Sequence, residues 1–126
     1  MQHLTLQDVV TACRRALEDG TLGALRHESC EYDYGDGYHC AVGVALTDDT
    51  LSVIQERGCN DEEVAHLIHA GIITIKENDL DDIRDLQIDH DKWASPRKSN
   101  EFWNRENFEN ELTHYEDKLA KQRESE

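Results

Sequence analysis

The pattern of apolar and polar residues predicts helices along most of this chain. The first helix is the clearest, because its apolar residues recur at the spacing of one helical face. They are Leu6, Val9, Val10, Cys13 and Leu17. Thr5 and Asp8 have the spacing of an N-terminal capping box, and Gly20 suits the position that follows a helix C-terminus. We therefore predict a helix from Leu6 to Asp19.

Residues 38–46 carry no charge, although one-third of the chain is charged. Such a run is a buried strand or a buried helix, and periodicity does not separate the two. Val42 and Val44 favour a strand, whereas the alanines and the leucine of the run favour a helix, and we interpret it as a helix. A glycine inside a helix costs about 1 kcal/mol relative to alanine, so Gly43 predicts that another backbone passes close to it.

Two shorter helices are expected next. A cap at one of residues 47–49 begins the first, which ends at Gly58. Asn60 is the expected N-cap of the second helix, over residues 61–70, and Gly71 ends it.

Residues 72–75 read Ile-Ile-Thr-Ile, a β-branched run that favours extended structure. A single strand needs a partner, and residues 31–34 are the region that we expect to pair with it. The surrounding residues 27–37 are polar and rich in glycine and acidic side chains, which indicates a loop.

Two longer helices complete the chain. The first is capped by Asn78 or Asp79 and ends before Pro96, because the residue that precedes a proline leaves the helical region. Its shared face carries Ile83, Leu86, His90 and Trp93. The second starts at Ser99 or Asn100. Its apolar stripe consists of Phe108, Leu112, Tyr115 and Leu119.

Length and pattern together predict the fold class. A chain of 126 residues is expected to form one domain, here residues 1–126 with a frayed C-terminus. We predict a mainly α domain of five or six helices with at most a small two-stranded β element. No run of about 18 apolar residues predicts a membrane span. The N-terminus lacks the basic and apolar regions of a signal peptide, so a cytoplasmic location is expected.

The net charge of the chain indicates which kinds of partner it can bind. Twenty-eight acidic residues face thirteen basic ones, which gives a net charge of −15. Direct binding to nucleic acid or to an anionic membrane is disfavoured, because phosphate contacts need lysine and arginine. A basic protein is the natural complement, and the field would accelerate that encounter. The simpler interpretation is that the charge provides solubility alone.

Residues 40–43, Cys-Ala-Val-Gly, with an aromatic residue two positions earlier and Leu46 after them, resemble a known motif. It is the C-A-[IV]-G helix of small uncharacterised proteins from bacteria and their phages. In that group an L-x-x-L-x-x-x-H-D-like helix follows, and Ile83, Leu86, His90 and Asp91 stand in the matching places. The resemblance implies a helical fold and a phage or mobile-element origin, not a reaction. By size and acidity the chain is also similar to anti-CRISPR and anti-restriction inhibitors, some of which mimic DNA.

Histidines supply the weak candidates for a metal site. His66 and His69 stand three residues apart on a predicted helix, so they can face one site. Cys59 and His90 are further candidate ligands by type, and His90-Asp91 invites comparison with metal-dependent phosphohydrolases. No third ligand has a fixed spacing, so surface or packing histidines are the favoured interpretation. The four cysteines contain no C-x-x-C pair and are expected to be reduced and mostly buried. We predict no cofactor and no catalytic residue.

The acidic residues form the strongest candidate site. Asp81, Asp85 and Asp89 recur every four residues along one side of a predicted helix, with Asp82 beside them. We call these four residues the aspartate ridge. Like charges at this spacing destabilise a helix by a few tenths of a kcal/mol per pair, which suggests a use for them. The last helix carries a second acidic patch, formed by Glu109, Glu111, Glu116 and Asp117, and Glu109 and Glu116 are its predicted contact residues. A solvated face is the alternative interpretation.

Three classes of function follow from these features. The favoured one is a non-enzymatic inhibitor or adaptor that binds a basic, nucleic-acid-handling protein through the aspartate ridge, Glu109 and Glu116. The second is a metal-dependent hydrolase that uses His66, His69, His90 and Asp91. The third is a structural homodimer without a ligand.

Overall fold

A computed structural model of the chain describes residues 1–22, 32, 39–60, 63–94 and 105–124. Within these ranges the structure contains five α-helices, two short 3₁₀ turns and a two-stranded sheet. The elements are β1 (Gln2–Leu4), α1 (Leu6–Asp19), η1 (Gly43–Ala45), α2 (Asp48–Glu56), α3 (Val64–His69), β2 (Ile73–Ile75), η2 (Glu77–Asp79), α4 (Leu80–Ala94) and α5 (Arg105–Glu124). The predicted class, a mainly helical domain with a small two-stranded element, is confirmed.

Helix α1 forms where the sequence predicts it. The Thr5 side chain accepts a hydrogen bond from the backbone N–H of Asp8, and the Asp8 carboxylate accepts one from the backbone N–H of Thr5. Gly20 follows the helix with φ 74°, a left-handed conformation that glycine adopts without strain. The apolar face of α1 is buried along its whole length.

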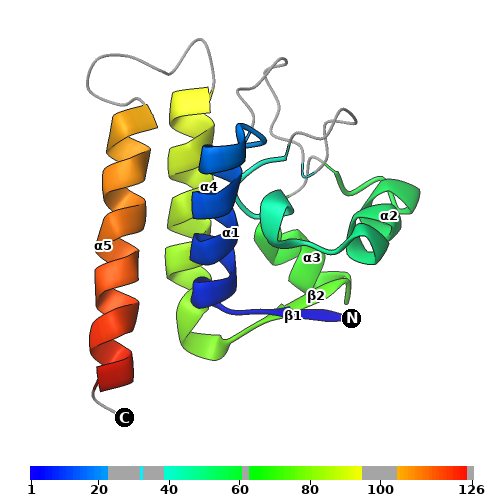
Figure 1. Ribbon diagram of the computed structural model, residues 1–126. Coiled ribbons are helices and arrows are strands. Elements are labelled where there is room, and N and C mark those ends of the chain that lie inside the picture. Colours follow the sequence, from blue (N-terminus) through cyan, green and yellow to red (C-terminus); the bar gives the residue numbers. More distant parts are fainter. Residues whose placement is uncertain (23–31, 33–38, 61–62, 95–104, 125–126) are drawn as a thin grey trace.

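Helices α1, α4 and α5 pack together and form one side of the molecule (Figure 1). Helices α1 and α4 run in the same direction, and α5 returns in the opposite one. The predicted stripe of α5 is confirmed, because Phe108 and Leu112 are fully buried, Tyr115 is nearly so, and Leu119 packs against the core. The predicted face of α4 is confirmed at Ile83, Leu86 and His90, which are also fully buried. No helix in the described ranges is both long and apolar enough to cross a bilayer.

The strand at Ile73–Ile75 is confirmed, but its predicted partner is wrong. Strand β2 pairs in parallel with β1 at the very start of the chain, in the register Gln2↔Ile73 and Leu4↔Ile75. The backbone N–H of Lys76 extends the pairing by donating to the carbonyl of Leu4 at 3.0 Å. Three residues are too few to show an alternating pattern, so the sequence carries no local signal for β1.

Each strand leads directly into one of the packed helices, and the two strand–helix units are tied together at this junction. Asp79 ends η2, just before α4, and its Oδ2 accepts a hydrogen bond from the backbone N–H of Leu6 at 2.8 Å. Leu6 is the first residue of α1, where N–H groups lack partners within the helix and negative charge is favoured. Asp79, which the sequence predicts as a cap of its own helix, therefore satisfies the N-terminus of α1.

The predicted helix over residues 38–46 is wrong in form, although the run is buried. Only Gly43–Ala45 are helical, as the 3₁₀ turn η1, whereas Cys40, Ala41 and Val42 are fully buried without regular structure. A Cβ atom on Gly43 would collide with the backbone carbonyl oxygen of Tyr32, so the predicted close approach of another backbone is confirmed.

Neighbouring side chains supply the hydrogen bonds that a regular helix would have made in this run. The backbone N–H of Val42 donates to Oε1 of the buried Gln87 at 2.9 Å, and the Cys13 thiol donates to the carbonyl of Ala41 at 3.1 Å. These two contacts come from α1 and α4. Because these partners are distant in sequence, the local pattern does not reveal them.

Helices α2 and α3 flank the turn η1 on the side of α1 away from α5 (Figure 1). Thr47 caps α2 by accepting a hydrogen bond from the N–H of Thr50, as predicted. Helix α3 is shorter than predicted, since it starts at Val64 with Glu63, not Asn60, at the N-cap position. The predicted loop over residues 27–37, except Tyr32, lies outside the described residues. So do Pro96 and the predicted helix start at Ser99 or Asn100.

Candidate functional site: an acidic seam between two helices

The aspartate ridge lies on α4, and its members fall into two environments. Asp81 and Asp85 are exposed, and neither forms an ion pair with another described residue. The side chains of Asp82 and Asp89 are only 23% and 16% exposed. The ridge is therefore not a uniform solvated face, because half of it is partly covered.

The two covered aspartates each have a lysine partner. Nζ of Lys118, on α5, lies 2.7 Å from Oδ2 of Asp82 and ties the two helices together. Nζ of Lys92, on α4 itself, lies 3.7 Å from Oδ1 of Asp89. At that separation the second pair is a looser contact than the first.

A fifth carboxyl group, that of Glu111 from the second acidic patch, meets this ridge from α5. Glu111 has a buried Oε2 atom without a hydrogen-bond partner, and its side chain is hydrogen-bonded to Asp89. Burial first, then the hydrogen bond to Asp89 and the charges of Asp89 and Asp85, raise the pKa of Glu111 to about 8, against the opposing effect of Lys92. Burial is thus the main reason why the protonated form of Glu111 is favoured over the charged form.

Tyr115 lies one helical turn further along α5, and the same charges affect its hydroxyl group. Burial first, followed by the charges of Asp82, Glu111, Asp85 and Asp89, raises the pKa of the Tyr115 hydroxyl. We call Asp82, Asp85, Asp89 and Glu111 the acidic seam. Burial is the main cause of the raised pKa in both side chains, and the negative charges of the ridge add to it.

A signal for Glu111 exists in the sequence. It stands three residues after Phe108 and four before Tyr115, so helical spacing places it beside the apolar stripe of α5. A carboxyl group next to a buried stripe is expected to be partly desolvated.

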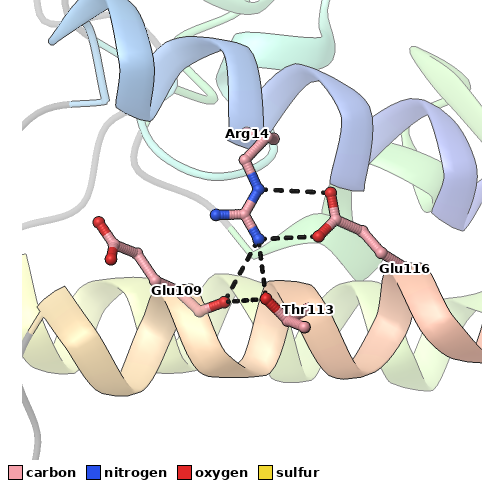
Figure 2. Close-up of polar contacts among 4 residues, drawn as sticks. All are labelled: Arg14, Glu109, Thr113 and Glu116. Carbon is pink, nitrogen blue, oxygen red and sulfur yellow. Dashed lines mark hydrogen bonds and ion pairs between the residues drawn. The ribbon is translucent and has the colours of Figure 1, made fainter.

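Glu116 is engaged inside the protein (Figure 2). The guanidinium of Arg14, on α1, donates from Nη2 to Oε1 of Glu116 at 2.7 Å and from Nε to Oε2 at 3.3 Å. The same Nη2 also donates to Oγ1 of Thr113 at 3.1 Å and to the Glu109 carbonyl at 3.5 Å. The hydrogen bond to Glu116 is the main cause that raises the pKa of Arg14.

Glu109 lies at the same contact but keeps its carboxylate turned away from Arg14 (Figure 2). That carboxylate pairs with Arg105, one turn earlier on α5, at 2.9 Å. Both predicted residues of the second acidic patch therefore have partners within the protein. Their role towards another protein stays a prediction.

The candidate metal ligands do not form a site among the described residues. His66 and His69 are exposed on α3, whereas His90 is fully buried on α4 with its ring edge-on to Phe108, the centroids 5.9 Å apart. Within the described ranges no three His, Cys, Asp or Glu side chains are arranged to hold a metal ion. The structure thus agrees with the interpretation of His90 as a packing residue.

The described cysteines are buried thiols, as the sequence analysis favours. Cys13, Cys40 and Cys59 are free and buried, and Cys30 lies outside the described residues. Burial, followed by the proximity of Cys40, raises the pKa of the Cys13 thiol far above its ordinary value. A thiol in that state is a poor nucleophile.

The acidic seam is therefore the place where the described structure gathers the most perturbed ionisable groups. Such groups concentrate at functional sites, although ion-pair networks also produce them. Comparison of the chain with protein-family models, with curated proteins and with solved structures gives no match.

Proposed function

We propose that this chain is a non-enzymatic, acidic binding protein that acts in the cytoplasm. It inhibits or sequesters a basic protein that handles nucleic acid, by offering the aspartate ridge to lysine and arginine side chains of that partner. The observation that carries the proposal is that Asp81 and Asp85 are exposed on α4 and form no ion pair with another described residue. Cationic side chains of a partner would supply the opposite charge there.

The exposed members of the ridge are the first point of contact. Asp81 and Asp85 stand one helical turn apart, which spaces their side chains by roughly 6 Å. Successive phosphates along one DNA strand have a comparable spacing, so a surface that binds DNA offers cationic groups of matching geometry. The proposed mode of inhibition is therefore occupation of a nucleic-acid groove, as in the phage-encoded inhibitors that the composition resembles.

Glu109 and Glu116 belong at the rim of the proposed interface. Their carboxylates already pair with Arg105 and Arg14. A partner protein would have to displace Arg105 from Glu109, or Arg14 from Glu116, before its own cations could pair with these carboxylates. We therefore assign the contact energy chiefly to the aspartate ridge.

A charge-matched comparison tests the proposal. In the test variant the four ridge aspartates become asparagine, and in the control variant four exposed acids on the α2–α3 side, Asp48, Asp49, Glu56 and Glu63, become their amides. Both variants lose the same charge, so a general effect of net charge acts on them equally.

Wild type, test variant and control variant are immobilised and incubated with nuclease-treated bacterial lysate. We expect wild type and the control to retain the same basic nucleic-acid-binding protein and the test variant to lose it, and we expect added duplex DNA to compete for the captured protein. Retention by the test variant equal to that by wild type would overturn the proposal. The proposal would also be overturned if the same protein were still captured at saturating DNA and its activity did not change.

A further inference from the structure

A hollow of about 500 Å³ lies between β1, α1 and η1, on the side of α1 that faces η1. Small-molecule sites have volumes of about 300–1,000 Å³. Four residues at helical spacing line the α1 wall, namely Asp8, Thr11, Ala12 and Arg15. We infer that this hollow binds a small aliphatic carboxylate, whose charged group meets Arg15 and whose hydrocarbon chain lies over Val44 and Ala45. The inference does not depend on a partner protein.

Arg15 is the cation that the hollow offers to a ligand. Its side chain is exposed and forms no hydrogen bond or ion pair with another described residue. By contrast, Arg14, Arg57 and Arg105 each donate to an acceptor within the protein. The planar guanidinium group matches the two oxygens of a carboxylate. Arg15 is therefore available to bind one from solution.

Two neutral donors stand beside this guanidinium group. Oγ1 of Thr11 accepts a hydrogen bond from Nε2 of Gln7 at 2.8 Å, which leaves the hydrogen of the Thr11 hydroxyl for another acceptor. Nδ1 of His3 lies 2.9 Å from Oγ1 of Thr74. In the tautomer in which the Thr74 hydroxyl donates to Nδ1, Nε2 of His3 carries a hydrogen that it can donate. The hollow thus offers uncharged donors as well as a cation to an anionic group.

The wall opposite α1 is held in place before any ligand arrives. Nε2 of Gln2 donates to the Ala45 carbonyl at 2.9 Å, and Oε1 of Gln2 accepts from the backbone N–H of Thr47 at 2.9 Å. These two bonds tie β1 to η1 and to the start of α2. Val44 and Ala45 are half-buried and supply apolar surface to the hollow. A wall that is already ordered lowers the entropic cost of binding.

The charges at the hollow favour a ligand with a single negative charge. Asp8 is the acidic residue of the lining, and its Oδ2 is held by the backbone N–H of Thr5. One guanidinium group balances one carboxylate. A second negative charge on the ligand would be repelled by Asp8 and by a chain whose net charge is −15. A monocarboxylate therefore fits the hollow better than a phosphate does.

NMR titration of the ¹⁵N-labelled full chain with butyrate tests the inference. Butyramide, a neutral molecule of the same shape, and inorganic phosphate are titrated in parallel. We expect saturable changes at the amides of Thr11, Arg15 and Ala45 with butyrate, with a dissociation constant on the order of 1 mM, and weaker binding of the other two. Equal binding of butyrate and butyramide, or tighter binding of phosphate, would overturn the inference. So would the absence of saturable changes at ~20 mM butyrate, which nearly saturates a site of that affinity.

A pair of charge-matched variants tests the place of binding. Arg15→Gln should bind butyrate about tenfold more weakly than wild type, because a hydrogen bond to a charged group is lost. Arg84→Gln removes the same charge from an exposed position on α4 and should bind as wild type does. Ala12→Leu keeps Arg15 but fills the hollow, so it should abolish binding. Equal affinity of Arg15→Gln and Arg84→Gln would overturn the inference, even if Ala12→Leu does not fold.

Discussion

Arg14 and Glu116 join the first and last helices of the described chain through a two-pronged ion pair. The shorter of its two hydrogen bonds measures 2.7 Å, and Thr113 and the Glu109 carbonyl accept further bonds from the same guanidinium nitrogen. Only arginine offers donors in this planar fork, and lysine is a single point of charge. The pair therefore fixes the orientation of α5 relative to α1, in addition to holding the two helices together.

We expect Arg14→Lys to reduce the free energy of unfolding by about 1 kcal/mol, although it keeps the charge, because the forked geometry is lost. Urea denaturation monitored by circular dichroism measures the change. Arg15→Lys, at an exposed position on the same helix, is the matched control and should be neutral. Equal stability of the two variants would show that charge alone matters at Arg14.

The close approach of backbones at Gly43 makes a second prediction. Gly43→Ala should reduce the free energy of unfolding by about 1–3 kcal/mol, because the new Cβ would overlap the Tyr32 carbonyl and the backbone must shift. Ser52→Ala, an exposed change in α2, controls for the substitution itself. An unchanged melting temperature for Gly43→Ala would place Tyr32 further away than the structure does.

The hydrogen bond from Leu6 to Asp79 predicts that a residue far along the chain caps α1. Asp79→Ala should cost about 1 kcal/mol of stability, because it leaves an N–H at the start of α1 without its acceptor. The neighbouring Asn78→Ala, for which no such bond is found among described residues, should change stability by less. Hydrogen exchange at the Leu6 amide gives the direct measurement, with faster exchange expected in Asp79→Ala alone.

The proposed partner interaction should depend on salt through the aspartate ridge. Screening acts over about 8–10 Å at physiological ionic strength, so the association rate should fall as salt is added. Replacing the four ridge aspartates with asparagine should lower the rate at low salt and flatten its salt dependence. Stopped-flow mixing with the captured partner measures both quantities. Identical salt slopes for the variant and wild type would reduce the ridge to a solubility feature.

The parts of the fold that the sequence predicts correctly are those whose cause is local. Helix α1 is bounded by Thr5 and Gly20, which lie beside the helix ends that they define. The stripe of α5 follows from helical spacing alone. The helix predicted over residues 38–46 is wrong in form, and Gln87, which accepts a hydrogen bond from Val42, is 45 residues away. Local patterns contain no information about such a partner.

The candidate site also has one part with a local cause, which the sequence predicts, and one part that depends on residues distant in the sequence. The ridge on α4 is a periodic pattern and is visible in the sequence, whereas the seam requires knowledge of which helix lies opposite. Burial first, and then residues of α4, raise the pKa of Glu111, and helical spacing along α5 indicates only the burial. The sequence predicts Glu116 as a contact residue for a partner protein, and it does not reveal that Arg14, 102 residues earlier, pairs with it.

The pairing of β1 with β2 has a consequence for how the chain is made on the ribosome. His3 contacts Thr74, 71 residues later, so the first strand emerges long before its partner exists. At roughly 5–20 residues per second the delay is on the order of 4–14 s. Helix α1 waits longer still for α5, because Glu116 follows Arg14 by 102 residues. The part of the apolar face of α1 that α5 covers therefore stays exposed beyond this delay, and a chaperone that binds such faces has that interval in which to act.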